Sequence, residues 1–124
     1  MIDCAFSQGS DGLLRAFRFF GHADTERAGR DLLCAAASTL GQTTIAGFVE
    51  LLEIVPRFEL DPDLGLIQMD FAAEQYKRLS QRKREDANLL IANCLLGVKL
   101  LAESNAERIQ WRVISHDEFQ ELVQ

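Results

Sequence analysis

The sequence predicts an α+β fold in which two helices pack on one face of a mainly antiparallel, five-stranded sheet. Apolar and polar residues alternate in several short segments, as in half-buried strands, and apolar residues recur at helical spacing in two longer ones. These segments follow one another in the order ββαββαβ. Two apolar helix stripes are most economically buried against one shared sheet, and 124 residues suit a single domain spanning 1–124.

A β-hairpin is expected at the start of the chain. Apolar and polar residues alternate over 2–7, which predicts a strand. Asp11-Gly12 is a strong hairpin-turn signal, so 13–20 is expected to be the returning strand. Residues 21–30 are polar between glycines and predict a flexible loop that orders when a ligand binds.

The first helix is expected from Leu32 to about residue 51, with Asp31 in the N-cap position. Gly41 and Gly47 lie inside it, although glycine destabilises a helix interior by about 1 kcal/mol relative to alanine. Small residues at these positions indicate that another element approaches closely.

The second half of the chain predicts a hairpin, a helix and a strand. Residues 56–71 contain two short extended runs around Asp61-Pro62-Asp63, which is a turn sequence. Apolar residues at helical spacing predict a helix over about 85–103, and alternation over 107–114 predicts a last strand.

The composition excludes several function classes. The formal net charge of −6 argues against broad nucleic-acid binding. The basic run 77–84 departs from this; we expect a solvated linker or helix face there, with RNA contact as the alternative.

Because neither a signal peptide nor a membrane-spanning run is recognisable, we expect a cytoplasmic protein without a membrane partner. The wide spacing of Cys4, Cys34 and Cys94 favours reduced thiols over a disulfide framework or a CxxC zinc site, so neither metal nor cofactor is expected.

The stretch "GHADTERAGRDLLCAAAS" (21–38) contains the candidate chemistry. If Asp31 caps the helix, Cys34 lies in its first turn, where unpaired N–H groups and the helix dipole favour thiolate. His22 lies twelve residues earlier and could fold back as a base, and Ser38 follows Cys34 by one helical turn. Each residue also has an ordinary interpretation: Cys34 as a small buried hydrophobe, His22 as a loop histidine and Ser38 as a back-bonding serine.

This stretch resembles the motif of the ribosomal-processing cysteine protease family, Prp. The motif reads Gly-His-Ala, a loop, then Gly-x-Asp-aliphatic-aliphatic-Cys-Ala-Ala-x-Ser. The matching residues are Gly21, His22, Ala23, Gly29, Asp31, Leu32, Leu33, Cys34, Ala35, Ala36 and Ser38. The likeness extends to the leading hairpin and to residues 89–103, and is poorest over 56–86 and the tail.

The resemblance implies a small α+β homodimer that removes the N-terminal extension of a large-subunit ribosomal protein, number twenty-seven, in ribosome assembly. It implies Cys34 as the nucleophile and His22 as the general base and acid. The other motif residues would support this dyad: Gly21, Gly29, Asp31, Ala35 and Ser38.

Two further expectations concern partners. Phe19 and Phe20 lead into His22, so part of their surface is expected to receive an apolar or aromatic residue of an extended peptide substrate. Gly41, Gly47 and Gly97 would leave flat helix surfaces suited to a homodimer.

Three alternatives to a peptidase are weighed against these residues. A non-catalytic dimeric module that binds a peptide or the ribosome is the main one, and retention of both dyad residues disfavours it. A zinc site from Cys34, His22 and Cys94 or His116 follows no known ligand spacing. A thiol phosphatase would need an arginine soon after the cysteine, and "CAAASTLG" has none.

Overall fold

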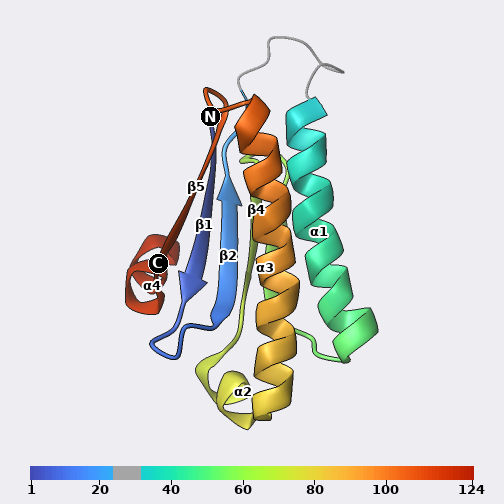
Figure 1. The fold of residues 1–124 in the computed structure, drawn as a ribbon, viewed down its shortest axis with the longest axis vertical. Helices are drawn as coiled ribbons and strands as arrows, with labels where there is room; N and C mark the ends of the chain where they lie inside the picture. The colour runs from blue at the N-terminus through green and yellow to red at the C-terminus, as the bar shows by residue number, and fades with distance from the viewer. Residues whose placement is uncertain (24–31) are drawn as a thin grey trace.

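The computed structural model describes residues 1–23 and 32–124 and has an α+β architecture (Figure 1). Residues 24–31 lie outside the described part, and with them the predictions for Gly29, for the Asp31 cap and for most of the loop. In chain order the elements are β1 (Ile2–Gln8), β2 (Leu14–Phe20), α1 (Leu32–Leu52), β3 (Arg57–Asp61), β4 (Leu66–Asp70), α2 (Ala73–Arg78), α3 (Gln81–Ser104), β5 (Ile109–Ser115) and α4 (His116–Val123).

The five strands form one sheet in the order β3-β4-β2-β1-β5. The two predicted hairpins are present as antiparallel pairs, β1 with β2 and β3 with β4. β5 instead pairs parallel to β1, from Ile2 opposite Ile109 to Gln8 opposite Ser115. The sheet is therefore mixed, which corrects the prediction of a mainly antiparallel one. A strand that is reached through a long helical crossover, as β5 is through α3, can lie parallel to its neighbour.

α1 and α3 lie side by side across one face of the sheet, as predicted (Figure 1). A Cβ at Gly41 would lie 3.0 Å from Ile67 Cγ2, and one at Gly97 would lie 2.6 Å from Leu40 Cδ2. The close approach predicted at Gly41 is therefore confirmed. The same contacts correct the argument for a dimer: these glycines face neighbouring elements of their own chain, as does Gly47 against Leu90.

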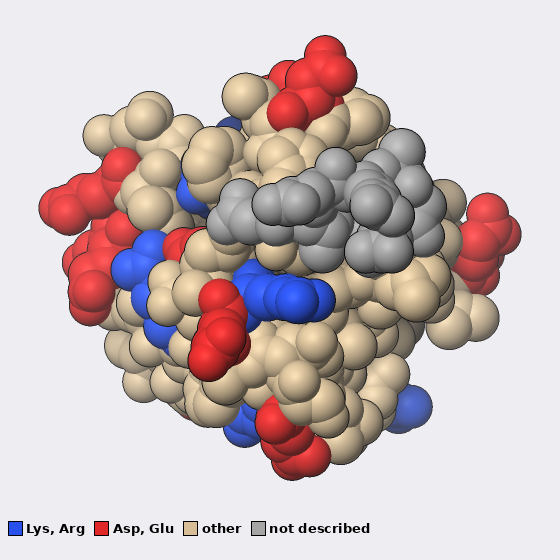
Figure 2. Space-filling model, turned by 90° about the horizontal axis from the view of Figure 1, so that it is seen from above, with Lys and Arg blue, Asp and Glu red and all other residues tan. Residues whose placement is uncertain are grey.

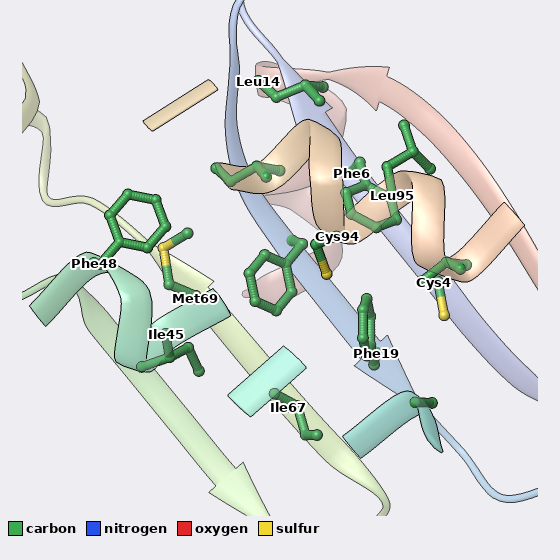
Figure 3. Close-up of a cluster of buried hydrophobic side chains, with 14 of the residues drawn as sticks. Cys4, Phe6, Leu14, Phe19, Ile45, Phe48, Ile67, Met69, Cys94 and Leu95 are labelled. Atoms are coloured by element: carbon green, nitrogen blue, oxygen red, sulfur yellow. The ribbon is translucent and has the colours of Figure 1, made fainter. Parts of the chain in front are cut away.

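Between helices and sheet lies an apolar core that also contains two of the three cysteines (Figure 3). Phe6, Phe17 and Phe19 pack ring against ring, with centroids 5.2–6.2 Å apart. Cys4 and Cys94 are 0% and 2% exposed among such side chains. Phe19, a predicted substrate contact, is thus mainly a core residue.

A short fourth helix, α4, covers part of the opposite sheet face. Phe6 faces the core, so its neighbour Ser7 faces away from α1 and α3. The buried Ser7 hydroxyl is hydrogen-bonded to His116 Nδ1 at 2.9 Å, at the start of α4. Ser115 caps α4 by accepting from the Glu118 N–H, and Phe119 is buried. The tail therefore belongs to the fold.

Of the two structures expected for the basic run 77–84, the helix face is the correct one and the linker is not, because the run spans the end of α2 and the first turn of α3. Ser80 caps α3 by accepting from the Lys83 N–H at 3.1 Å. The Arg84 guanidinium donates to the Tyr76 and Lys77 carbonyl oxygens of α2, which fixes the corner between the two helices. α3 starts four residues before the predicted position because this cap was not recognised.

By length and composition alone, α1 and α3 could each cross a membrane. Core helices of water-soluble domains meet the same criterion, and here each helix has a buried face: Leu33, Ala37 and Phe48 of α1, and Ala87, Ile91 and Val98 of α3.

Candidate active site

Cys34 is the third residue of α1 and lies in its first turn, as predicted. The first N–H groups of a helix have no partner within it and carry the positive end of the helix dipole. Cys34 is half-buried, packed against the edge of the core but not enclosed by it. Its sulfur therefore lies where negative charge is stabilised and where another molecule can reach.

One hydrogen bond ties this sulfur to the segment that contains the histidine. The buried Ala23 N–H donates to Cys34 Sγ at 3.3 Å, and Ala23 directly follows His22. A donor aimed at sulfur favours its charged form. The residue after His22 therefore contacts the thiol at the start of α1.

His22 is held by contacts on both its backbone and its ring. The Met1 nitrogen donates to the His22 carbonyl oxygen, and the imidazole Nε2 lies 3.1 Å from the Asp63 carbonyl oxygen. Asp63 belongs to the turn between β3 and β4. The imidazole is exposed, so these contacts define its place without burying it.

Two glycines let three backbone segments meet beside His22. Gly21 has φ +104° and Gly65 has φ +62°, both in the left-handed region that favours glycine. A Cβ at Gly21 would overlap the Met1 carbonyl oxygen, and one at Gly65 would overlap the Gly21 carbonyl oxygen. The start of β1, the end of β2 and the β3–β4 turn therefore pack directly together.

Cys34 and His22 line the same pocket, of about 310 Å³. Gly21, Phe19 and Ser38, three other predicted site residues, also line it. Its remaining lining is mostly apolar and comes from β1, α1, β3, β4 and the turn: Ile2, Ala37, Gln42, Leu60, Asp61, Pro62, Gly65, Leu66 and Ile67. Such a pocket suits an uncharged, largely apolar side chain.

Two predicted residues lie away from the pocket. Phe20 is on the other sheet face, opposite Asp3, and its ring stacks under the Arg18 guanidinium at 4.5 Å. It was expected to contact substrate, but side chains of a strand alternate between faces, so Phe19 and Phe20 cannot both face the pocket. Ala35 is exposed on α1 and is not part of the lining.

The role of the β3–β4 hairpin in this site was not predicted from the sequence. Asp61-Pro62-Asp63 predicted the turn, but nothing in the local pattern placed it against His22. The hairpin lines the pocket with residues 60–62 and 65–67. It lies there because β4 pairs with β2, and this pairing is a long-range contact.

The other cysteines and the second histidine lie in different surroundings. Burial raises the pKa of Cys94 to about 11 and also raises that of Cys4. Burial, and then the nearby Arg15 charge, lower the pKa of His116, which is bonded to Ser7. Neither Cys94 nor His116 lines the pocket with Cys34 and His22, and the part of the chain that the structure describes contains no cluster of three metal-binding side chains.

The charge at the pocket end of the molecule is mixed. Figure 2 views the molecule from this end, and acidic and basic side chains are interspersed on the surface that is not grey. A phosphate backbone would favour a continuous basic surface instead.

Comparison with known proteins agrees with the resemblance in the sequence. The family model described as cysteine protease Prp matches residues 1–110. None of the curated proteins matches the chain.

Several solved structures have the same fold. The protein SMU.848 from Streptococcus mutans has a TM-score of 0.76 at 26% identity, covering 94% of this chain and 96% of that one. The essential ribosomal processing protease Prp from S. aureus, in complex with a substrate peptide, has a TM-score of 0.74 at 19% identity, covering 92% and 100%. Its complex with a covalently linked product peptide has a TM-score of 0.76 at 20% identity, with the same coverage.

Proposed function

The chain belongs to the Prp family of cysteine proteases, and from that premise we propose that it removes the N-terminal extension of the large-subunit ribosomal protein number twenty-seven. Cys34 is the proposed nucleophile and His22 the general base and acid. The similar S. aureus protease is a ribosomal processing enzyme with a bound substrate peptide, which supports a peptide substrate here.

The observation that carries the proposal is the hydrogen bond from the Ala23 N–H to Cys34 Sγ. It joins the two halves of the motif, which the sequence separates by a loop, and brings the residue after His22 into contact with the thiol. With both side chains on one pocket, nucleophile and base can act on the same bound peptide.

The proposed reaction has two steps. His22 takes the thiol proton, and the Cys34 sulfur attacks the scissile carbonyl carbon to form a tetrahedral oxyanion beside the first N–H groups of α1. Collapse breaks the C–N bond; the imidazolium gives its proton to the leaving amine and an acyl thioester remains. His22 then takes a proton from water, whose oxygen attacks the thioester, and the released sulfur recovers a proton from His22.

The pocket lining favours an apolar residue next to the scissile bond. Leu60, Leu66 and Ile67 form much of the wall, and contact with them removes apolar surface from water. We therefore propose that the β3–β4 hairpin, and not Phe20, contacts this residue of the substrate, and the predicted preference for an apolar residue is kept.

We also propose that the protein acts as a cytoplasmic homodimer. Leu89, Leu96 and Leu100 follow one face of α3 and are 67%, 55% and 59% exposed. An apolar helix face of this kind is typical of an interface. Sedimentation should give twice the 13.9 kDa chain mass; a species of one chain mass at micromolar concentration would contradict the dimer.

Cleavage of a synthetic peptide tests the proposal. The peptide carries the N-terminal extension and the first mature residues of that ribosomal protein from the same genome. We expect a single cut by the native protein and a loss of at least about a thousandfold in Cys34→Ala, which should still bind the peptide. Cys94→Ala is the matched control and should cleave normally, since Cys94 is buried in the core. Binding without cleavage by the native protein would favour the non-catalytic binding module.

A further inference from the structure

The hydrogen bond on the His22 ring defines which nitrogen carries the proton. Nε2 lies 3.1 Å from the Asp63 carbonyl oxygen, and a carbonyl can only accept. Nε2 must therefore be the donor. In the neutral imidazole the lone pair then lies on Nδ1, and Nδ1 is the basic nitrogen.

The direction of that carbonyl is fixed by the side chain of Asp61. The Leu64 N–H donates to Asp61 Oδ1 at 3.3 Å, and the Asp63 N–H donates to the same oxygen at 3.1 Å. The Leu64 N–H and the Asp63 carbonyl belong to one planar peptide unit and point in opposite directions. Holding the N–H on Asp61 therefore aims the carbonyl away from Asp61 and toward the ring of His22.

The turn is also held from its other end. The Gly65 N–H donates to the Pro62 carbonyl oxygen at 3.3 Å, which closes the turn. A Cβ at Gly65 would lie 3.2 Å from His22 Cε1, so the turn backbone packs directly on the imidazole. Asp61 itself lines the pocket.

We propose that Asp61 is a positioning residue for His22. Its carboxylate orients the 63–64 peptide, the Asp63 carbonyl accepts the Nε2 proton, and Nδ1 is left as the base. The Asp63 main-chain carbonyl thus accepts the hydrogen bond that a side-chain amide accepts from the histidine in cysteine proteases with a third catalytic residue. The proposal rests on the proposed function, in which His22 is the base.

Three variants separate this role from a general effect of charge on the hairpin. Asp61→Ala removes the acceptor, Asp61→Asn keeps an acceptor oxygen but removes the charge, and Glu59→Ala removes an equal charge two residues away on β3, outside the pocket. We expect kcat/KM to fall about 10- to 100-fold in Asp61→Ala, as for a displaced catalytic group. The other two variants should stay close to the native value. Equal losses in Glu59→Ala, or no recovery in Asp61→Asn, would overturn the proposal.

A spectroscopic readout tests the geometry without relying on cleavage. In ¹⁵N-histidine-labelled protein at alkaline pH, where neutral imidazole dominates, the His22 nitrogens should report the Nε2–H tautomer. His22→Gln assigns the signals against His116. Asp61→Ala should give a tautomer mixture, whereas Asp61→Asn and Glu59→Ala should keep Nε2–H. An Nδ1–H tautomer in the native protein would overturn the positioning role even if cleavage is normal. If the native protein shows the Nε2–H tautomer but cleaves no peptide, the positioning role is supported and the proposed function is contradicted.

Discussion

The pocket and the core hold the same two reactive residue types in opposite surroundings. In the pocket Cys34 is half-buried and accepts an N–H, and His22 is exposed with its ring on a main-chain carbonyl. In the interior Cys4 and Cys94 are enclosed by apolar side chains, and His116 is tied to a buried hydroxyl. Under the proposed function, position in the fold, and not residue type, decides which thiol and which imidazole act.

The two histidines should differ most in their effect on cleavage. His22→Ala removes the proposed proton carrier and should lower kcat/KM by about 10²- to 10⁴-fold. His116→Gln, which can still hydrogen-bond Ser7, should leave kcat/KM unchanged because it lies outside the pocket. Steady-state kinetics on one peptide compares the two variants. An equal loss of kcat/KM in both would contradict the different roles given to His22 in the pocket and His116 in the interior.

Local sequence patterns predicted most of the elements and half of the site. The alternation in β1 and β2, the apolar stripes of α1 and α3, and the placing of Cys34 in the first turn of α1 are all local properties. The parallel partner of β5 and the meeting of the β3–β4 turn with His22 are long-range contacts. No local period encodes such contacts, which explains why the parallel pairing of β5 and the pocket wall were not predicted.

A pair of leucines tests the pocket wall with a smaller expected effect. Leu60 and Leu64 are 45% and 50% exposed, but only Leu60 lines the pocket. Leu60→Ala should lower kcat/KM by about tenfold for a peptide with an apolar residue at the cut, because apolar contact is lost. Leu64→Ala should have no such effect. Equal kinetics in the two variants would place the substrate elsewhere.

The smallest expected effect is on stability at low pH. The pKa of His116 is lowered in the folded protein from its ordinary value of 6.5, so the unfolded chain binds the proton more readily. The folded protein should therefore lose stability as pH falls below about 6.5. His116→Gln should lose less between pH 7.5 and 5.5 in chemical denaturation. A steeper loss in the variant than in the native protein would contradict the sign.

Competition among the three thiols tests the central claim most directly. The folded protein is treated with limiting iodoacetamide near neutral pH, and peptide mapping follows each cysteine. Thiolate is the reacting form, so Cys34 should be alkylated first, while Cys94, with a pKa raised to about 11, and Cys4, whose pKa burial also raises, should lag behind. His22→Ala should slow the labelling of Cys34 and leave the other two unchanged. Labelling of Cys4 or Cys94 before Cys34 would contradict the account.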